Sequence, residues 1–231
     1  MNGLRMDFRL GVRQVVRRPG FTAAIVLSLA LGIGANSAVF SVVDATLMRP
    51  LPVPEPDRLV AIYTTRAESV VAGGFSQRDL ADYREALSGE VFTELMGHGG
   101  VPFSLAGERA AELVWGEQVT AGYFTGLGVE PAAGRLFGPT DFADDPGRRL
   151  AVLAHGLWLR RFGGDPAAVG RTIQLTGHDY TVVGVAREGF SGVKFLGYAP
   201  EVWVPAAARA RAHGDTGLIE DRGRRALELY G

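Results

Sequence analysis

The chain carries, at residues 21–43, the stretch FTAAIVLSLALGIGANSAVFSVV, which contains no charged side chain. An α-helix rises about 1.5 Å per residue, so roughly 20 apolar residues cross a hydrocarbon core about 30 Å thick. A charge at the centre of the bilayer costs about 2.5–3.5 kcal/mol, which explains why such a stretch excludes charges. We therefore predict one transmembrane helix over residues 20–48.

The residues before this stretch carry a stripe of arginines. Side chains four residues apart share one face of a helix. We predict that residues 1–19 form an amphipathic helix on the membrane surface, with its cations toward anionic headgroups. With five arginines and Asp7, the side chains of this segment sum to +5 − 1 = +4, so the positive-inside rule keeps it cytoplasmic. The orienting residues are Arg5, Arg9, Arg13, Arg17 and Arg18. The helix would then span the inner (cytoplasmic) membrane once, and the rest of the chain is expected on its periplasmic, extracytoplasmic side.

Three other interpretations of the apolar stretch are open. A secretory signal peptide has an apolar core of about 7–15 residues and a small-x-small cleavage site, whereas this stretch is longer and no such site follows it before Asp44. A twin-arginine export signal would use Arg17 and Arg18. A buried core helix of a soluble protein normally shows polar residues on one face. We favour the retained anchor.

Small residues within the apolar stretch indicate a surface on which another helix can pack. Small side chains let two transmembrane backbones approach closely, and an amide or hydroxyl can bond across the interface. We expect this role for Gly32, Gly34, Asn36 and Ser37. The partner would be another transmembrane helix or a second copy of the chain.

Prolines alternate directly after the apolar stretch, at Pro50, Pro52, Pro54 and Pro56. Each proline fixes its own φ and favours an extended conformation in the residue before it. We therefore predict that residues 49–57 form a stiff, extended strut that couples the membrane helix rigidly to the domain after it.

Residues 58–231 have the pattern of an α+β domain with mixed sheets. The clearest feature is a hairpin, with strands at 172–175 and 180–183 around a turn at 176–179. Ser76 is a predicted N-cap of a helix that runs to Leu87. Further strands are predicted at 58–63, 112–120, 150–153 and 201–204, with helical segments at 121–127 and after residue 153.

The composition and motifs give little sign of catalysis. The formal net charge is −1 without a basic patch in the domain, so nucleic acid is not an expected partner, and the absence of cysteine excludes thiolate chemistry and disulfides. No P-loop motif occurs, so the chain does not bind ATP through one, and no cofactor is expected. His98, His155, His178 and His213 lack metal-ligand spacing. The acidic turn with Asp141, Asp144 and Asp145 does not follow a calcium-loop pattern, and residues 97–100 are interpreted as a bend between strands.

Several motifs occur in an order typical of one family of membrane proteins. They are RRPGFT at 17–22, LGIGANSAVFS at 31–41, RPLPVPEPDRLV at 49–60, YF at 123–124, LGV at 127–129, GRLF at 134–137, FGGDP at 162–166, VGRT at 169–172, VVGVA at 182–186 and WVP at 203–205. Together they resemble MacB/FtsX-type ABC transporter permeases, most closely the duplicated orphan permeases of that superfamily.

This resemblance implies a mechanotransmitter with a periplasmic core domain of two small mixed α/β lobes. A cytoplasmic ABC ATPase would drive motion through the transmembrane helices to a periplasmic protein or an amphiphilic substrate. Complete permeases have at least four spans, so we expect this chain to be a truncated piece whose core domain, residues 58–231, is incomplete. Two alternatives are a single-span anchored binding or scaffold domain without an ATPase, and a hydrolase that uses His155.

Overall fold

The structure is a computed structural model that describes residues 18–43, 51, 53–66, 69–87, 89, 91–107, 110–143, 148–193 and 199–231. The chain divides into two compact units, residues 1–49 and residues 50–231, which are described separately. The predicted surface helix at 1–19, except for its last two residues, lies outside the described residues.

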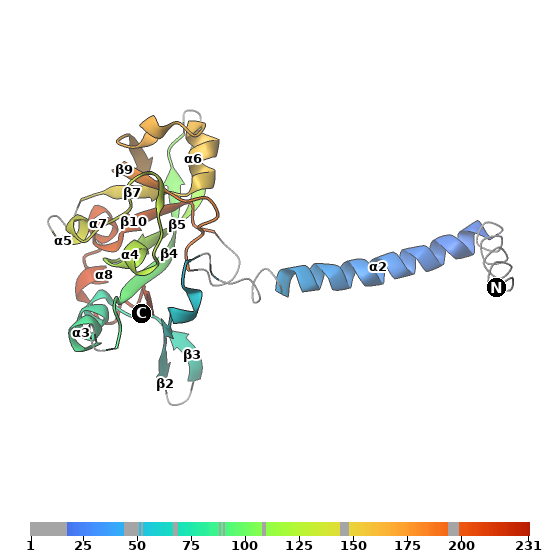
Figure 1. The fold of residues 1–231 in the computed structure, drawn as a ribbon, viewed down its shortest axis with the longest axis horizontal. Helices are drawn as coiled ribbons and strands as arrows, with labels where there is room; N and C mark the ends of the chain where they lie inside the picture. The colour runs from blue at the N-terminus through green and yellow to red at the C-terminus, as the bar shows by residue number, and fades with distance from the viewer. Residues whose placement is uncertain are drawn as a thin grey trace. The chain divides into compact units, whose positions relative to one another are not determined.

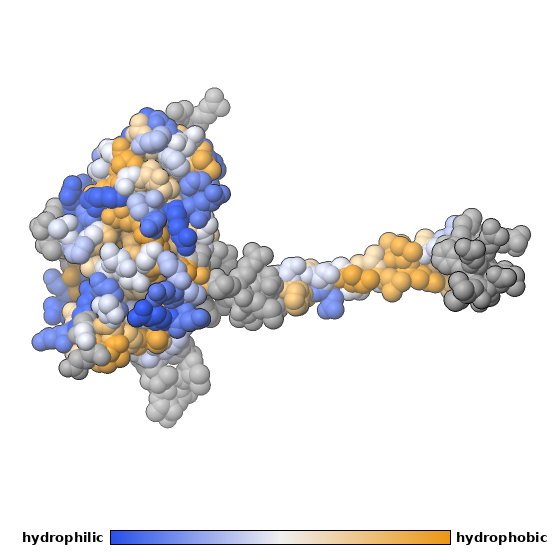
Figure 2. All heavy atoms as spheres, in the orientation of Figure 1, coloured by the Kyte–Doolittle hydropathy of each residue, from blue (hydrophilic) through white to orange (hydrophobic). Residues whose placement is uncertain are grey.

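The first unit contains the helix α2 (Pro19–Val43). Its 25 residues correspond to about 37 Å. Of the described residues, only the segment Pro19–Ser41 is long and apolar enough to cross a membrane, a criterion that an N-terminal signal sequence also meets. Its described side chains are solvent-exposed apart from the half-buried Thr22, so the alternative of a buried core helix is wrong. Figure 2 shows apolar side chains over much of the visible face of this helix.

Six strands of the second unit close into a mixed barrel, in the order β4, β5, β10, β7, β9 and β8, with β8 returning to β4. Figure 1 labels β4, β5, β10, β7 and β9 of this barrel. The pairs β5–β10 and β7–β9 are parallel and the other four are antiparallel. The closing contact is short, because β8 meets β4 at the single pair Leu105–Leu175. The expected mixed α+β class is confirmed.

The strands of this sheet and their bounds are β1 (Ala61–Ile62), β4 (Met96–Leu105), β5 (Glu112–Val119), β6 (Pro131–Gly134), β7 (Leu150–Leu153), β8 (Thr172–Leu175), β9 (His178–Ala186), β10 (Val202–Pro205) and β11 (Glu228–Tyr230). β11 extends the barrel sheet beside β4 and carries β1 at its outer edge, while β6 pairs with β9. A separate hairpin joins β2 (Thr64–Arg66) to β3 (Ser69–Gly73).

The helices of the second unit are short. They are η2 (Pro56–Arg58), α3 (Gln77–Leu87), α4 (Tyr123–Gly126), α5 (Thr140–Ala143), α6 (His155–Phe162), η3 (Pro166–Ala168), α7 (Ala206–Ala212) and α8 (Gly217–Glu220). The N-cap prediction for α3 is confirmed, because the Asp79 amide donates to Ser76 Oγ at 3.0 Å and the Ser76 amide donates to Asp79 Oδ2 at 2.9 Å.

Apolar side chains form one cluster inside the barrel and a second on its outer face. Alternate residues of a strand face opposite sides of the sheet, so Phe103 and Val202 point inward. Trp203, the neighbour of Val202, points outward and packs against Phe124 of α4, with 5.8 Å between the ring centroids. A third, smaller cluster lies under α3. Residues 50–231 thus form one compact unit in which a barrel and a smaller layer can be distinguished.

Most of the predicted elements are present. The hairpin at 172–186 is confirmed, with a tighter turn than expected because Thr176 and Gly177, at φ 49° and 82°, form a two-residue turn between β8 and β9. The strands at 112–120, 150–153 and 201–204 are confirmed to within one residue at either end. The predicted strand at 58–63 is reduced to β1, because η2 occupies its start.

The interpretation of residues 97–100 as a bend is wrong, because they lie within the long strand β4. The glycines are present for a different reason than a turn. A Cβ on Gly99 would lie 2.2 Å from the Ala226 carbonyl oxygen, so the segment before β11 approaches β4 too closely for any side chain there.

Candidate functional site

The segment that begins at Leu51, after α2, lies against the domain. Val53 is buried in the cluster on the outer face of the barrel, and Leu51 and Leu59 pack against the same cluster. Further along, Val60 and Gly231 exchange two backbone hydrogen bonds of 2.9 and 3.0 Å. We refer to residues 51–60 as the linker. Side-chain burial and backbone pairing therefore hold the linker to the domain.

The prediction of an extended strut over residues 49–57 is wrong at its C-terminal end. Pro56 begins the 3₁₀ helix η2, because proline is well suited to the first position of a helix, where no amide hydrogen is required. Pro54 lies against Gly128, whose Cβ position would be 3.3 Å from the Pro54 ring. Pro50 and Pro52 lie outside the described residues.

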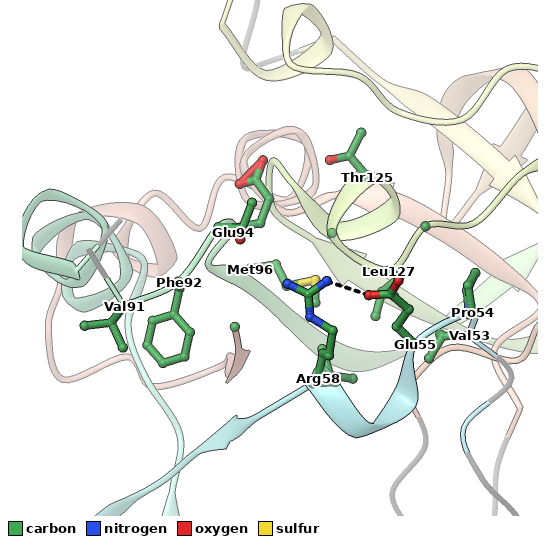
Figure 3. Close-up of a pocket in the computed structure, with 15 residues that line it drawn as sticks. Val53, Pro54, Glu55, Arg58, Val91, Phe92, Glu94, Met96, Thr125 and Leu127 are labelled. Atoms are coloured by element: carbon green, nitrogen blue, oxygen red, sulfur yellow. Dashed lines mark hydrogen bonds and ion pairs between the residues drawn. The ribbon is translucent and has the colours of Figure 1, made fainter. Parts of the chain in front are cut away.

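A cleft of about 620 Å³ is lined in part by the linker and in part by the neighbouring domain surface. One wall is formed by the linker, the second by the segment leading into β4, and the third by α4 and the turn after it. Figure 3 shows the Glu55–Arg58 ion pair on the linker side, Val91 and Phe92 toward the other end, and Glu94 and Thr125 along the rim.

The ion pair at this cleft is exposed to solvent and therefore weak. Arg58 Nη1 lies 2.7 Å from Glu55 Oε2, but both side chains are exposed, so the pair contributes little to stability. Behind the rim, Arg84 donates from Nε to the Leu95 carbonyl at 2.9 Å and from Nη2 to the Ala121 carbonyl at 2.6 Å. Burial lowers the pKa of Arg84, and the charge of Glu94 partly opposes that shift. This arrangement suits binding and docking more than acid–base catalysis.

The membrane-related residues are placed only in part. Arg5, Arg9, Arg13 and Arg17 lie outside the described residues. Arg18 is exposed and precedes α2, where its carbonyl accepts the Thr22 amide at 3.0 Å. Their proposed role in orientation stays a prediction.

The residues of the predicted helix-packing surface, Gly32, Gly34, Asn36 and Ser37, lie in α2 and are exposed. A Cβ on either glycine would meet nothing within 4 Å, so there is room on this surface for a second helix. Ser41 Oγ donates to the Ser37 carbonyl at 2.8 Å, the bond by which a hydroxyl is satisfied within an apolar environment.

His155, the residue of the hydrolase alternative, begins α6 and packs edge-on against Trp158 at 5.4 Å between ring centroids. It lines a second cleft of about 350 Å³, together with Ser191 and Glu201. No hydrogen bond between His155 and a nucleophile is present among the described residues, so the geometry gives no support to a hydrolase.

The acidic turn is engaged by an arginine. Asp144 and Asp145 lie outside the described residues, but Asp141 is buried and accepts from Arg135 Nη2 at 2.7 Å and from the Gly138 amide at 2.9 Å. Burial alone would raise the pKa of Asp141, but the bonds from Arg135 and Gly138 outweigh it and hold the pKa below its usual value.

Asp141→Asn is expected to lower the free energy of unfolding by about 1–2 kcal/mol near neutral pH, the lower range for a bond to a charged group because Arg135 is half-exposed. Because the folded pKa of Asp141 is depressed, its contribution is present above the unfolded pKa and is lost as the pH falls through the folded pKa. Chemical unfolding of both proteins from pH 6 down to about pH 3 checks this, and a difference that stays constant on acidification would contradict it.

Sequence reasoning missed a buried polar cluster on the outer face of the barrel. Glu117, near the C-terminal end of β5, accepts hydrogen bonds from Tyr123 Oη and from Trp203 Nε1, both at 2.8 Å. His98 of β4 lies beside it, with Nδ1 3.3 Å from Glu117 Oε1. The available signal was a glutamate inside a predicted strand, at a position between Gly116 and Gln118.

The domain has the fold of extracytoplasmic domains of transporter permeases. It is similar to the extracellular domain of the noncanonic ABC-type transporter YknZ from Gram-positive bacteria, with a TM-score of 0.55, 15% identity, and coverage of 74% of this chain and 81% of that one. It is also similar to the periplasmic region of MacB from Actinobacillus actinomycetemcomitans, with a TM-score of 0.52, 12% identity, and coverage of 74% of this chain and 86% of that one. A domain assigned to a permease of Porphyromonas gingivalis has a TM-score of 0.52 and 15% identity, with coverage of 77% of this chain and 73% of that one. At these identities the likeness shows the fold.

The family follows from the sequence. The pattern that defines the family described as "MacB-like periplasmic core domain" matches residues 22–224, which is most of the chain. The chain therefore belongs to the MacB-like periplasmic core domain family. Comparison with curated protein sequences gives no match. The family and the fold together support an extracytoplasmic location for the domain.

Proposed function

We propose that this protein is a membrane-anchored permease subunit of a MacB/FtsX-like ABC transporter. In this proposal α2 spans the inner membrane and relays motion from a cytoplasmic ABC ATPase to the extracytoplasmic domain. The domain then acts on a periplasmic protein or an amphiphilic substrate. The protein itself is not an enzyme and binds no cofactor, since ATP is bound by the separate subunit.

The observation that carries this proposal is the docked linker. Only residues 44–50 separate α2 from Leu51, the first linker residue that packs on the apolar cluster at the outer face of the barrel. A displacement of the membrane helix would therefore act on buried contacts and on the β1–β11 pair. Coupling then depends on docking of the linker and not on the stiffness of an extended proline segment.

Co-purification tests this proposal. The full chain, expressed in the organism that encodes it, is extracted in mild detergent and captured by an affinity tag at its C-terminus. We expect the ATPase in stoichiometric amount, and a captured chain that still contains α2. Recovery of the intact chain without an ATPase would favour the alternative of an anchored scaffold, and a chain cleaved after α2 would contradict both.

The orientation of the helix provides a separate prediction. Replacing Arg5, Arg9, Arg13, Arg17 and Arg18 together by glutamate is expected to invert the helix in most molecules, because the cytoplasmic side would lose its excess of cations. Protease protection in spheroplasts reports which side the domain occupies. The matched control replaces the same five residues by lysine, which keeps the charge and should keep the domain outside. Unchanged orientation in the glutamate variant would refute the orienting role.

A further inference from the structure

The imidazole of His98 is enclosed between two carboxylates that come from different strands. Its side chain is 6% exposed, and Nδ1 lies 3.3 Å from Glu117 Oε1 of β5. On the opposite edge of the ring, Nε2 lies 3.8 Å from Glu228 Oε2 of β11. Neither ring nitrogen has a hydrogen-bond partner among the described residues. A buried group without partners calls for an explanation, because such groups are rare in folded proteins.

Glu117 is held firmly in position. It is 2% exposed, and the 2.8 Å bonds from Tyr123 Oη and Trp203 Nε1 both end on Oε2. Its other oxygen, Oε1, is the one that faces His98. Two donors thus fix the carboxylate, while the oxygen directed at the imidazole stays available for a bond.

The two tyrosines that pack on the ring stay neutral near physiological pH. Tyr123 of α4 and Tyr230 of β11 pack on the imidazole, at 5.9 and 5.4 Å between ring centroids. Burial, followed by the charge of Glu117, raises the pKa of Tyr123 well above its usual value. Burial, followed by the charges of Glu228, Tyr63 and Glu117, raises the pKa of Tyr230 to about 12. Histidine is the side-chain type that ordinarily changes its charge between about pH 5 and 8.

Glu228 lies in β11, so a bond to His98 would link two neighbouring strands. β11 has three residues and lies between β4 of the barrel and β1, which directly follows the linker. His98 and Glu228 are direct partners in the β4–β11 register. A bond between their side chains would therefore fasten β11, and through it β1, to the barrel.

We propose that His98 is a pH-operated latch that fastens β11 to the barrel when it takes up a proton. Neutral imidazole has one N–H donor, so it can serve only one of the two carboxylates. The imidazolium has two donors, and it can bond Glu117 from Nδ1 and Glu228 from Nε2 after a small shift of the exposed Glu228 side chain. An extracytoplasmic domain meets changes of pH directly. The latch does not depend on the proposed coupling to an ATPase.

Hydrogen exchange of the β11 amides tests the latch. The full chain in detergent micelles is compared at about pH 5.5 and about pH 7.5, after correction for the intrinsic exchange rates. We expect protection of residues 229–231 to be about tenfold greater at the lower pH, the scale of one hydrogen bond to a charged group. His98→Gln and Glu228→Gln should each abolish this difference.

Two control variants separate the latch from other effects of pH. Glu130→Gln removes an exposed carboxylate before β6 and should keep the full difference. His213→Gln tests another histidine: burial, followed by Arg209 and His178, lowers the pKa of His213, so this group destabilises the folded state as the pH falls. Its replacement should also leave the β11 difference in place.

Two results would overturn the proposal. One is equal protection of β11 at both pH values in the unmodified chain, and the other is a difference that persists in Glu228→Gln. If His98→Gln fails to fold, Glu228→Gln still tests the latch, because the Glu228 side chain is 54% exposed and its replacement disturbs no core contact. Neither result bears on whether an ATPase is bound.

Discussion

Trp203→Ala is expected to lower the free energy of unfolding by about 3–5 kcal/mol, the usual cost of removing a large aromatic side chain from a core. The indole is 0% exposed and packs on Phe124 and Phe190, with ring centroids 5.8 and 5.3 Å away. The substitution also removes the Nε1 bond to the buried Glu117 carboxylate. Chemical unfolding of the full chain, followed by intrinsic fluorescence and circular dichroism, measures the loss.

Two variants divide this effect into its parts. Trp203→Phe keeps most of the packing and removes the donor to Glu117, so a loss of about 1–3 kcal/mol is expected from the weakened satisfaction of a buried charge. Trp115→Ala changes the same residue type at a position that is 46% exposed on β5, and its cost should be under about 1 kcal/mol. Equal costs at Trp203 and Trp115 would contradict the assignment of Trp203 to the centre of the core.

Val53→Asp is expected to release the linker from the barrel and to abolish the response of the domain to ATP in an assembled transporter. A carboxylate at this buried position would lack a partner, and its desolvation costs several kcal/mol, more than the packing of one linker residue can offset. In the chain alone, the linker should become sensitive to proteolysis while β5, β7 and β10 keep their slow hydrogen exchange. In the complex, ATP hydrolysis should continue without movement of the domain.

The matched control for this prediction is Val60→Asp. Val60 belongs to the same linker and is the same residue type, but its side chain is half-exposed and its contribution is the backbone pair with Gly231. This variant should keep both the protection of the linker and the response to ATP. If Val53→Asp leaves the response intact while its linker is cleaved, docking is not the coupling element.

Sequence patterns predicted the regular parts of the domain well, for a physical reason. The hairpin at 172–186 has alternating apolar residues around a turn at Gly177. The cap pairs Ser76 with Asp79 three residues later, because each side chain accepts the backbone amide of the other residue. Both signals are local. The apolar helix is equally local, since a long stretch without charge needs no tertiary information to be recognised.

The failures came from interactions between distant parts of the chain. Residues 97–100 contain three glycines that are typical of a turn, yet they form a strand because the segment before β11 passes directly over Gly99. The prolines after α2 predicted an extended strut, but tertiary burial of Val53 and the start of η2 at Pro56 decide the path of the linker. The cluster of His98, Glu117 and Tyr123 joins three elements, so no spacing in the sequence reveals it.

The strand order of the barrel has a consequence for how the chain acquires its structure during synthesis. β10 is the last barrel strand to be made, yet it lies between β5 and β7, which precede it by many residues. Until residues 202–205 emerge, the β4–β5 hairpin and the β7–β9 unit can meet through the short Leu105–Leu175 pair of β4 and β8, which has no support from the opposite side of the barrel. The domain must therefore remain open while most of its length is delivered, with apolar strand faces exposed to whatever surrounds the growing chain.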